Sequence, residues 1–258
     1  MPSTTIFSDN GSIALHVDAG IATIRFGHEK SNSLPGVLLQ SLASTITAVG
    51  AREDVRVIVL RSEGQGAFCA GASFDELTSI DDHATGKEFF LGFARVILAM
   101  VNAPVPVVTA VQGKVAGGGV GVVAASDYAI AVDKASLKLS ELAIGIGPFV
   151  VGPVIAHKIG EGAFGAMALD ADWRDAAWAE RHGLYAQVVR DPAALDDAVM
   201  ARARQIADAN PEAVRGIKKI LWDGLGHWKD LLEERAGISG RLVLSDFTRA
   251  AIAKFKGR

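Results

Sequence analysis

Two short stretches near the start of the chain combine several hydrophobic residues with a few polar ones. They cover residues 12–17 and 21–26, and Asp18-Ala19-Gly20 separates them. Short runs of this kind are typical of β-strands, and a short link that contains glycine is typical of a turn. The pattern therefore predicts a β-hairpin at the start of the fold.

Farther along, hydrophobic residues recur at helical spacing and then in a continuous run. The helical positions are Leu38, Leu39, Leu42, Ile46 and Val49. A strand-like run follows at residues 55–61, and the same order recurs with a helix over 87–101 and a strand over 105–111. Because a helix between two buried strands usually makes a right-handed crossover, the order predicts an α/β core with parallel strands.

The second half of the chain continues this alternation and then becomes helical. Strands are predicted over residues 128–132 and around 137–139, after a helix of small residues at 120–126. From about Arg174 the composition changes to charged, alanine-rich segments. These segments predict three helices, over residues 193–209, 211–222 and 227–240.

Composition limits the size and the class of the protein. The 258 residues, half of them hydrophobic, allow one large domain with a small appendage, which we divide into residues 1–195 and 196–258. The net charge of −3 supplies no long-range attraction for nucleic acid, and no apolar run approaches the roughly 18 residues of a membrane span. The N-terminus lacks a signal-peptide pattern and the chain has a single cysteine, so we expect a cytoplasmic protein.

The first candidate for a functional loop is Phe68-Cys69-Ala70-Gly71-Ala72. It precedes Ser73-Phe74-Asp75-Glu76, which matches a Ser-x-x-Glu capping box. The Ala72 amide would then lie beside a helix N-terminus, where free N–H groups and the helix dipole favour an oxyanion. A turn glycine followed by an ordinary helix cap is the alternative interpretation. We expect Cys69 to be a small packing residue and not a nucleophile.

A second glycine-rich loop, residues 116–121, follows the strand predicted at 105–111. Its glycines allow close approach of a ligand to the backbone, and Gly118 could supply a second N–H donor; tight helix-to-sheet packing is the alternative. The run Gly119-Val120-Gly121-Val122-Val123-Ala124 also matches a dinucleotide-binding fingerprint. Because more than a hundred residues of α/β pattern precede it, an NAD-dependent dehydrogenase is a minor alternative.

A series of short motifs resembles the crotonase superfamily, the enoyl-CoA hydratase and isomerase family. In chain order the motifs are Ser31-Asn32-Ser33-Leu34, residues 67–72, Pro104-Val105, residues 116–119, Asp127, residues 144–148, Gly183-Leu184, and residues 211–214 followed by Lys218 or Lys219. The resemblance covers nearly the full chain. It implies an α/β fold built as a crotonase-like spiral of repeated ββα units, with a helical C-terminal region that packs into a trimer or a dimer of trimers.

The same resemblance implies an acyl-CoA thioester as substrate, with coenzyme A as part of that substrate and no separate cofactor. It assigns the two amides that hold the thioester oxygen to Ala72 and Gly118. The residues that it implies for coenzyme A binding are Lys30, Ser31, Asn32, Ala70, Phe255 and Lys256, the last as a phosphate partner.

Glu141 is the candidate acid and base. Family hydratases use two glutamates, and the corresponding positions here are Gly121 and Glu141, so one carboxylate is missing. A single glutamate suits migration of a double bond, and Gly147-Pro148-Phe149 resembles the family's isomerases. We expect Leu139, Leu142, Ile144 and Phe149 to desolvate the carboxylate and raise its pKa. Hydration stays open if another acid enters the site, the candidates being Asp75, Glu76, Asp81 and Asp82.

Two non-enzymatic classes of protein are alternatives on the same scaffold. A catalytically silent acyl-CoA binder is an alternative because of Gly121. An RNA-binding protein on this scaffold is disfavoured by the acidic balance and by the absence of basic and aromatic clusters. The six histidines lack the close spacing of a zinc site, so we expect no metal.

Overall fold

The main sheet of the protein has seven strands. The computed structural model describes the backbone of residues 4–8 and 11–256 and the side chains of residues 11–254. The sheet order is β1-β2-β3-β4-β5-β7-β10. The strands are β1 (Thr4–Ser8), β2 (Gly11–Asp18), β3 (Ile21–Gly27), β4 (Val57–Ser62), β5 (Val107–Val111), β7 (Tyr128–Val132) and β10 (Gln187–Val189). The first three pair antiparallel and all later pairs are parallel, which confirms the predicted hairpin and the α/β core.

A second, smaller sheet lies beside the first. It contains β6 (Val115–Ala116), β8 (Ser136–Lys138) and β9 (Arg174–Asp175). Two isolated bridges, Leu34 to Ala72 and Cys69 to Val115, continue the same ladder toward the start of the chain. Each turn of the chain therefore adds one strand to the main sheet and one short segment to the second, which is the predicted spiral of ββα units.

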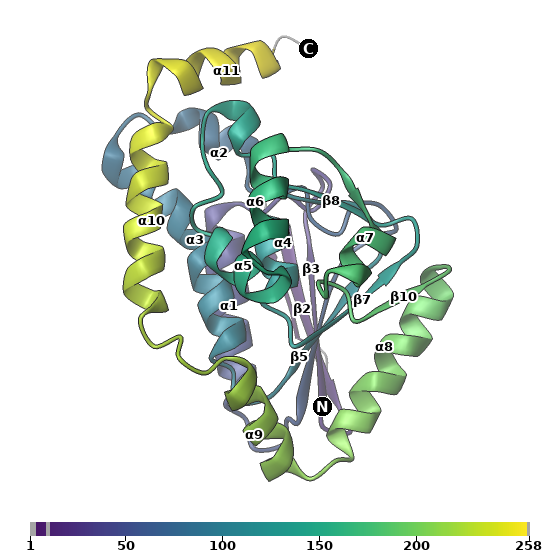
Figure 1. Ribbon diagram of the computed structural model, residues 1–258. Helices are drawn as coiled ribbons and strands as arrows, with labels where there is room; N and C mark the ends of the chain where they lie inside the picture. Colours follow the sequence, from purple (N-terminus) through teal and green to yellow (C-terminus); the bar gives the residue numbers. More distant parts are fainter. Residues whose placement is uncertain (1–3, 9–10, 257–258) are drawn as a thin grey trace.

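Long helices cover the two faces of the main sheet. On one side α1 (Gly36–Gly50), α3 (His83–Val101) and α10 (Trp228–Leu242) pack side by side, and on the other α8 (Pro192–Ala207) packs against β4, β5 and β7 (Figure 1). The boundary that we drew between residues 195 and 196 falls inside α8, whose contacts are with the sheet. The division into two regions stays a prediction.

The remaining helices are shorter. They are α2 (Phe74–Ser79), α4 (Gly118–Ala124), the 3-10 turn η1 (Leu142–Ile144), α5 (Gly152–Ile159), α6 (Glu161–Asp170), α7 (Ala176–Arg181), α9 (Pro211–Leu221) and α11 (Asp246–Lys256). The yellow C-terminal helix α10 runs along one side of the molecule, and α11 lies across the top in this view (Figure 1). Among the described residues, none of the helices combines the length and the apolar character that crossing a membrane requires.

A buried ion pair anchors α9 to the core. The Lys218 ammonium lies 2.6 Å from a carboxylate oxygen of Asp127 and donates to the Met100 carbonyl at 2.9 Å. Trp222 Nε1 and the Val107 amide also donate to Asp127, at 2.7 and 2.6 Å. Because buried charges are stable only when paired and hydrogen-bonded, this network fixes where the C-terminal helices begin to cover the sheet.

Candidate active site

Three loops that are far apart in the sequence are tied together by backbone hydrogen bonds. The Phe68 amide donates to the Lys114 carbonyl, the Ala116 amide to the Cys69 carbonyl and the Gly117 amide to the Lys138 carbonyl, each at 2.9 Å. The loop at 68–72, the loop at 114–118 and the segment at 138–141 therefore form one rigid platform. Ala72, Gly118 and Glu141 lie on these three segments, one on each.

Two amides on this platform are free to bind a ligand. Within the described part of the chain, the N–H groups of Ala72 and Gly118 donate no hydrogen bond, although the amides of Ser73 and Gly117 beside them do. Both residues line the same cavity. Ser73 accepts from the Glu76 amide at 3.3 Å and so caps α2 as predicted. The second half of the capping box is absent, because Glu76 instead accepts from the Gly36 amide at 2.8 Å.

The glycines of the second loop are required by its geometry. Gly117 has φ 52° and ψ −126°, a conformation that side chains disfavour. A Cβ atom on Gly118 would lie 2.5 Å from the ring of Phe93. The loop thus approaches α3 more closely than any other residue at position 118 would allow, and the Phe93 ring lies directly against it.

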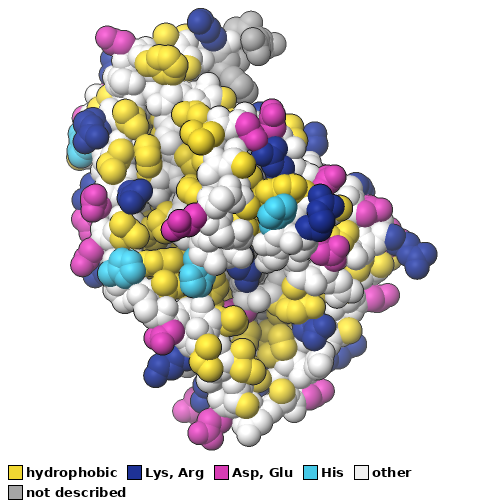
Figure 2. All heavy atoms as spheres, in the orientation of Figure 1, with side chains coloured by type: hydrophobic (Ala, Val, Ile, Leu, Met, Phe, Trp, Pro, Cys, Tyr) yellow, Lys and Arg dark blue, Asp and Glu magenta, His cyan; other side chains and the backbone are white. Residues whose placement is uncertain are grey.

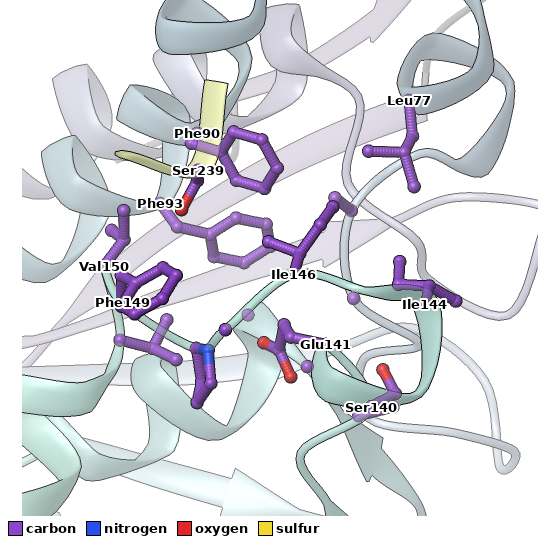
Figure 3. A pocket seen from close by; sticks show the side chains of 18 of the residues that line it. Leu77, Phe90, Phe93, Ser140, Glu141, Ile144, Ile146, Phe149, Val150 and Ser239 are labelled. Carbon is purple, nitrogen blue, oxygen red and sulfur yellow. The ribbon is translucent and has the colours of Figure 1, made fainter. Parts of the chain in front are cut away.

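The cavity has a volume of about 540 Å³ and a predominantly apolar wall. Its aromatic residues come mainly from α2, α3 and the segment after η1, and Figure 3 shows Phe90, Phe93 and Phe149 around its interior. The larger aliphatic and aromatic side chains that line it are Phe74, Leu77, Phe89, Phe90, Phe93, Ile144, Ile146, Phe149, Val150, Val151 and Trp173. Such a wall favours an apolar group over a charged one.

Glu141 projects its carboxylate into this cavity (Figure 3). Its Oε2 atom is buried and has no hydrogen-bond partner among the described residues. Burial raises the pKa of Glu141 from 4.5 to about 7, while bonds to the backbone of Glu141 and Ser140 oppose the rise. The expected desolvation is therefore confirmed, but Leu142 does not contribute to it because its side chain is 44% exposed and lies outside the cavity lining.

Among the described residues lining the cavity, Glu141 is the only carboxylate. A Cβ atom on Gly121 would lie 2.6 Å from Val151 Cγ1, so Val151 occupies the space in which a second glutamate would have to fit. The four acids that could have replaced it are engaged or exposed elsewhere. Asp75 pairs with Lys30, Glu76 holds Gly36, Asp81 is exposed and Asp82 caps α3.

The residues predicted to bind coenzyme A lie at different distances from the cavity, and some are used within the fold. Ala70 lines the cavity, and its amide donates to the Ser31 carbonyl at 3.2 Å, which places the exposed Ser31 beside the site. Lys30 is exposed and paired with Asp75. Asn32 is buried, and its side chain bonds the carbonyls of Glu63 and Ala67, so its amide group is used within the fold and is not directed at the cavity. The side chains of Phe255 and Lys256 lie outside the described residues.

The dinucleotide fingerprint is used for packing. A Cβ atom on Gly119 would lie 2.8 Å from Cys69 Cβ, and the glycines at 119 and 121 are buried. This burial leaves no open face for a pyrophosphate, which argues against the dehydrogenase alternative. Cys69 is fully buried and burial raises its pKa to about 12, in agreement with a packing role. No cluster of His, Cys, Asp or Glu that could hold a metal occurs in the described residues.

Sequence reasoning missed part of the cavity. Val151 and Ser239 both line it, although they come from α5's N-terminal cap and from α10. The acyl lining is expected from residues 77–101 and from the C-terminal helices, and Phe89, Phe90 and Phe93 of the first segment do line the cavity. Which side chains of these segments face the cavity was not predicted, because helical spacing shows an apolar side but not what packs against it.

The spiral of ββα turns therefore presents two free amides and one desolvated carboxylate to an apolar cavity. The family described as Enoyl-CoA hydratase/isomerase matches residues 16–236. The chain therefore belongs to the enoyl-CoA hydratase/isomerase family.

Individual proteins agree with this assignment. The chain is 31% identical over 225 residues to the (7aS)-7a-methyl-1,5-dioxo-2,3,5,6,7,7a-hexahydro-1H-indene-carboxyl-CoA hydrolase of Mycobacterium tuberculosis, covering 86% of this chain and 84% of that protein. It is 30% identical over 198 residues to the mitochondrial methylglutaconyl-CoA hydratase of Rattus norvegicus, covering 75% of this chain and 62% of the relative. The crystal structure of an enoyl-CoA hydratase from Mycobacterium avium superposes with a TM-score of 0.85 at 26% identity, covering 97% of each chain.

Proposed function

We propose that the protein moves a double bond in an acyl-CoA thioester, with Glu141 as its single acid and base. The observation that carries this proposal is that Glu141 is the only carboxylate among the described residues that line the cavity. Its Oε2 atom has no hydrogen-bond partner in the described part of the protein, so it is free to accept a proton from the substrate.

The reaction needs one proton to leave one carbon and return to another. Glu141 removes a proton from C2 of a 3-enoyl thioester, and the electron pair moves into the thioester carbonyl to form a dienolate. The N–H groups of Ala72 and Gly118 donate to the resulting oxyanion; an oxyanion donor is worth about 10²–10³ in rate in other enzymes. The protonated Glu141 then returns the proton to C4, which gives the 2-enoyl thioester with all atoms balanced.

The environment of Glu141 suits both steps. A general acid and base works best when its pKa lies near the working pH, and burial raises the pKa of Glu141 to about 7. The apolar wall, which includes Phe149 and Ile146, limits the access of bulk water to the carboxylate (Figure 3).

Hydration or hydrolysis is the second candidate, and the names of the relatives favour it. The M. tuberculosis protein is named a hydrolase and the rat protein a hydratase. Val151 argues against hydration and hydrolysis, because its side chain fills the space beside Gly121 with a hydrocarbon group. A catalytically silent acyl-CoA binder with the same cavity is the third candidate.

Coenzyme A would enter beside Ala70 and Ser31, the two predicted residues that lie at the cavity and next to it. Lys30 is close in sequence, and its exposed ammonium would exchange Asp75 for a phosphate at little cost, because exposed ion pairs are weak. Lys256 remains a proposed phosphate partner on the last turn of α11.

We also propose that the chain assembles as a trimer or a dimer of trimers. Ile217 and Ile220 on α9 and Phe247 on α11 are 60%, 77% and 72% exposed. In the space-filling view, hydrophobic side chains lie between charged ones on the face that carries the C-terminal helices (Figure 2). Sedimentation velocity would test this proposal, since a monomer at micromolar concentration would contradict it.

One assay separates the three candidate activities. The protein is incubated in deuterated water with 2-enoyl and 3-enoyl thioesters, and the products are read by mass spectrometry and NMR. Isomerisation predicts interconversion of the two, with deuterium at C2 or C4. A 3-hydroxy product formed at a high rate would support the hydratase, and binding without label or product would support the silent binder.

A further inference from the structure

The helix α10 approaches the cavity unusually closely because two glycines allow it. A Cβ atom on Gly86 of α3 would lie 2.9 Å from the Gly240 carbonyl oxygen, and one on Gly240 would lie 2.5 Å from the Lys87 amide nitrogen. The two helix backbones are therefore in direct contact at this crossing. The residue before Gly240 is Ser239, which the crossing holds against the cavity wall built by α3.

Ser239 is 1% exposed and lines the cavity. The structure describes no hydrogen bond of its hydroxyl group, which is not one of the fully buried polar atoms without a partner and therefore faces the cavity. A hydroxyl group that faces an apolar cavity without a protein partner usually binds a ligand or a water. The α10 helix places a polar atom where the neighbouring side chains are hydrocarbon.

The surroundings of Ser239 define what could reach it. Figure 3 shows Ser239 beside Phe90 and Phe93, across the cavity from Glu141, with its oxygen atom toward the interior. Among the described residues that line the cavity, the charged ones are Lys138 and Glu141, both on the segment 138–141. A ligand group that satisfies the hydroxyl must therefore pass between aromatic rings, which suits an uncharged oxygen on an otherwise hydrocarbon skeleton.

We propose that Ser239 recognises an oxygen atom, a ketone or hydroxyl group, on the part of the acyl group remote from the thioester. The substrate class is then a bulky hydrocarbon acyl thioester with one distal oxygen function, in place of a plain fatty acyl chain. This inference rests on the proposed function, because it takes the cavity to be the acyl site.

The alternative occupant is an ordered water that bonds Ser239 and does not contact the acyl group. The two occupants predict different selectivity of the protein between acyl thioesters. If an acyl oxygen takes the bond, an analogue without that oxygen leaves the hydroxyl unpaired and binds more weakly. If water takes the bond, the protein binds both analogues with equal affinity, and removal of the Ser239 hydroxyl does not change the ratio of the two affinities.

The test uses two unreactive thioesters of matched shape, 3-cyclohexylpropanoyl-CoA and 3-(4-oxocyclohexyl)propanoyl-CoA. Their dissociation constants are measured by calorimetry for the wild-type protein, Ser239→Ala and the control Ser44→Ala, which alters an exposed serine on α1. We expect the wild type and the control to prefer the oxo compound by roughly tenfold. For Ser239→Ala, the dissociation constants of the two compounds should lie within about twofold of each other, because the variant binds the oxo compound more weakly than the wild type does.

Two results would overturn the inference while leaving the acyl site intact. One is equal binding of the two thioesters by the wild type, and the other is a preference that survives in Ser239→Ala. If the wild type binds neither thioester, the proposed function itself fails and this inference fails with it. The affinity for 3-cyclohexylpropanoyl-CoA thus tests the acyl site, and the ratio of the two dissociation constants tests the role of Ser239.

Discussion

Val151 stands where a side chain on Gly121 would have to be. A Cβ atom at position 121 would lie 2.6 Å from Val151 Cγ1 and 2.8 Å from its Cβ. The position that holds a second glutamate in the family's hydratases is therefore both empty of a side chain and closed by a hydrocarbon group. This relationship, more than the mere absence of an acid, argues that the protein works with one carboxylate.

The contact between these two residues can be measured. Gly121→Ala should lower the free energy of unfolding by about 1–3 kcal/mol, as overpacked cores do. Val151→Ala in the same chain removes the nearer methyl group and should recover part of that loss, giving a favourable interaction energy in a double-mutant cycle. Gly162→Ala is the matched control, because no atom lies within 4 Å of a Cβ at that position. Equal stability of Gly121→Ala and the wild type would contradict the account.

Glu141 should make the protein less stable as the pH rises. Burial raises its pKa from 4.5 to about 7, so the folded state binds more protons than the unfolded state between these values. The free energy of unfolding therefore falls as the pH rises from about 4.5 to about 7 and stays lower above it. At 1.36 kcal/mol for each pH unit, the total effect is on the order of 3 kcal/mol.

Glu141→Gln removes this titration. The stability of the variant relative to the wild type should rise with pH across that window, as measured by urea unfolding at pH 5, 6, 7 and 8. Glu53→Gln, at an exposed position before β4, is the control. A stability difference that is independent of pH would show that the Glu141 carboxylate is ordinarily solvated.

The buried ion pair under α9 should carry a large share of the stability. Lys218→Met leaves Asp127 buried without its cation, which typically costs about 3–5 kcal/mol. Lys219→Met on the same helix alters an exposed residue and should stay within about 0.5 kcal/mol of the wild type. Urea denaturation of both variants provides the comparison, and similar midpoints for the two would refute a structural role for the pair.

Cys69 should be inert in the folded protein. It is fully buried, and burial raises its pKa to about 12, so thiolate is scarce at neutral pH. The single thiol should resist iodoacetamide at pH 8 and react fully in denaturant. Rapid labelling of the native protein, followed by mass spectrometry, would instead indicate an open and activated cysteine.

Much of the fold follows from local pattern. The short hydrophobic runs at 12–17 and 21–26 form β2 and β3, and the segment with helical spacing at residues 38–49 forms α1. The predicted helix at 87–101 begins earlier, at His83, because Asp82 accepts from the Ala84 and Thr85 amides and caps it. Periodicity finds the apolar face of an element, whereas a side-chain cap fixes where the element begins.

The site was only partly predictable, because its walls come from distant segments. Asp127 and Lys218 are 91 residues apart and were noted as separate motifs, without any sign that they would pair. Asn32 was expected to contact coenzyme A, yet two backbone carbonyls use its side chain. Ser239 carries no local signal at all, since only the contact of Gly86 with Gly240 brings it to the cavity.

In the proposed reaction Glu141 alone moves the proton. The most direct test measures deuterium uptake at C2 and C4 of a 3-enoyl-CoA thioester in deuterated water, with the wild type and with Glu141→Gln, while calorimetry confirms that both bind the thioester. We expect rapid uptake of deuterium with the wild type, and none above background with a variant that still binds. Label at the wild-type rate in Glu141→Gln would contradict the proposed reaction.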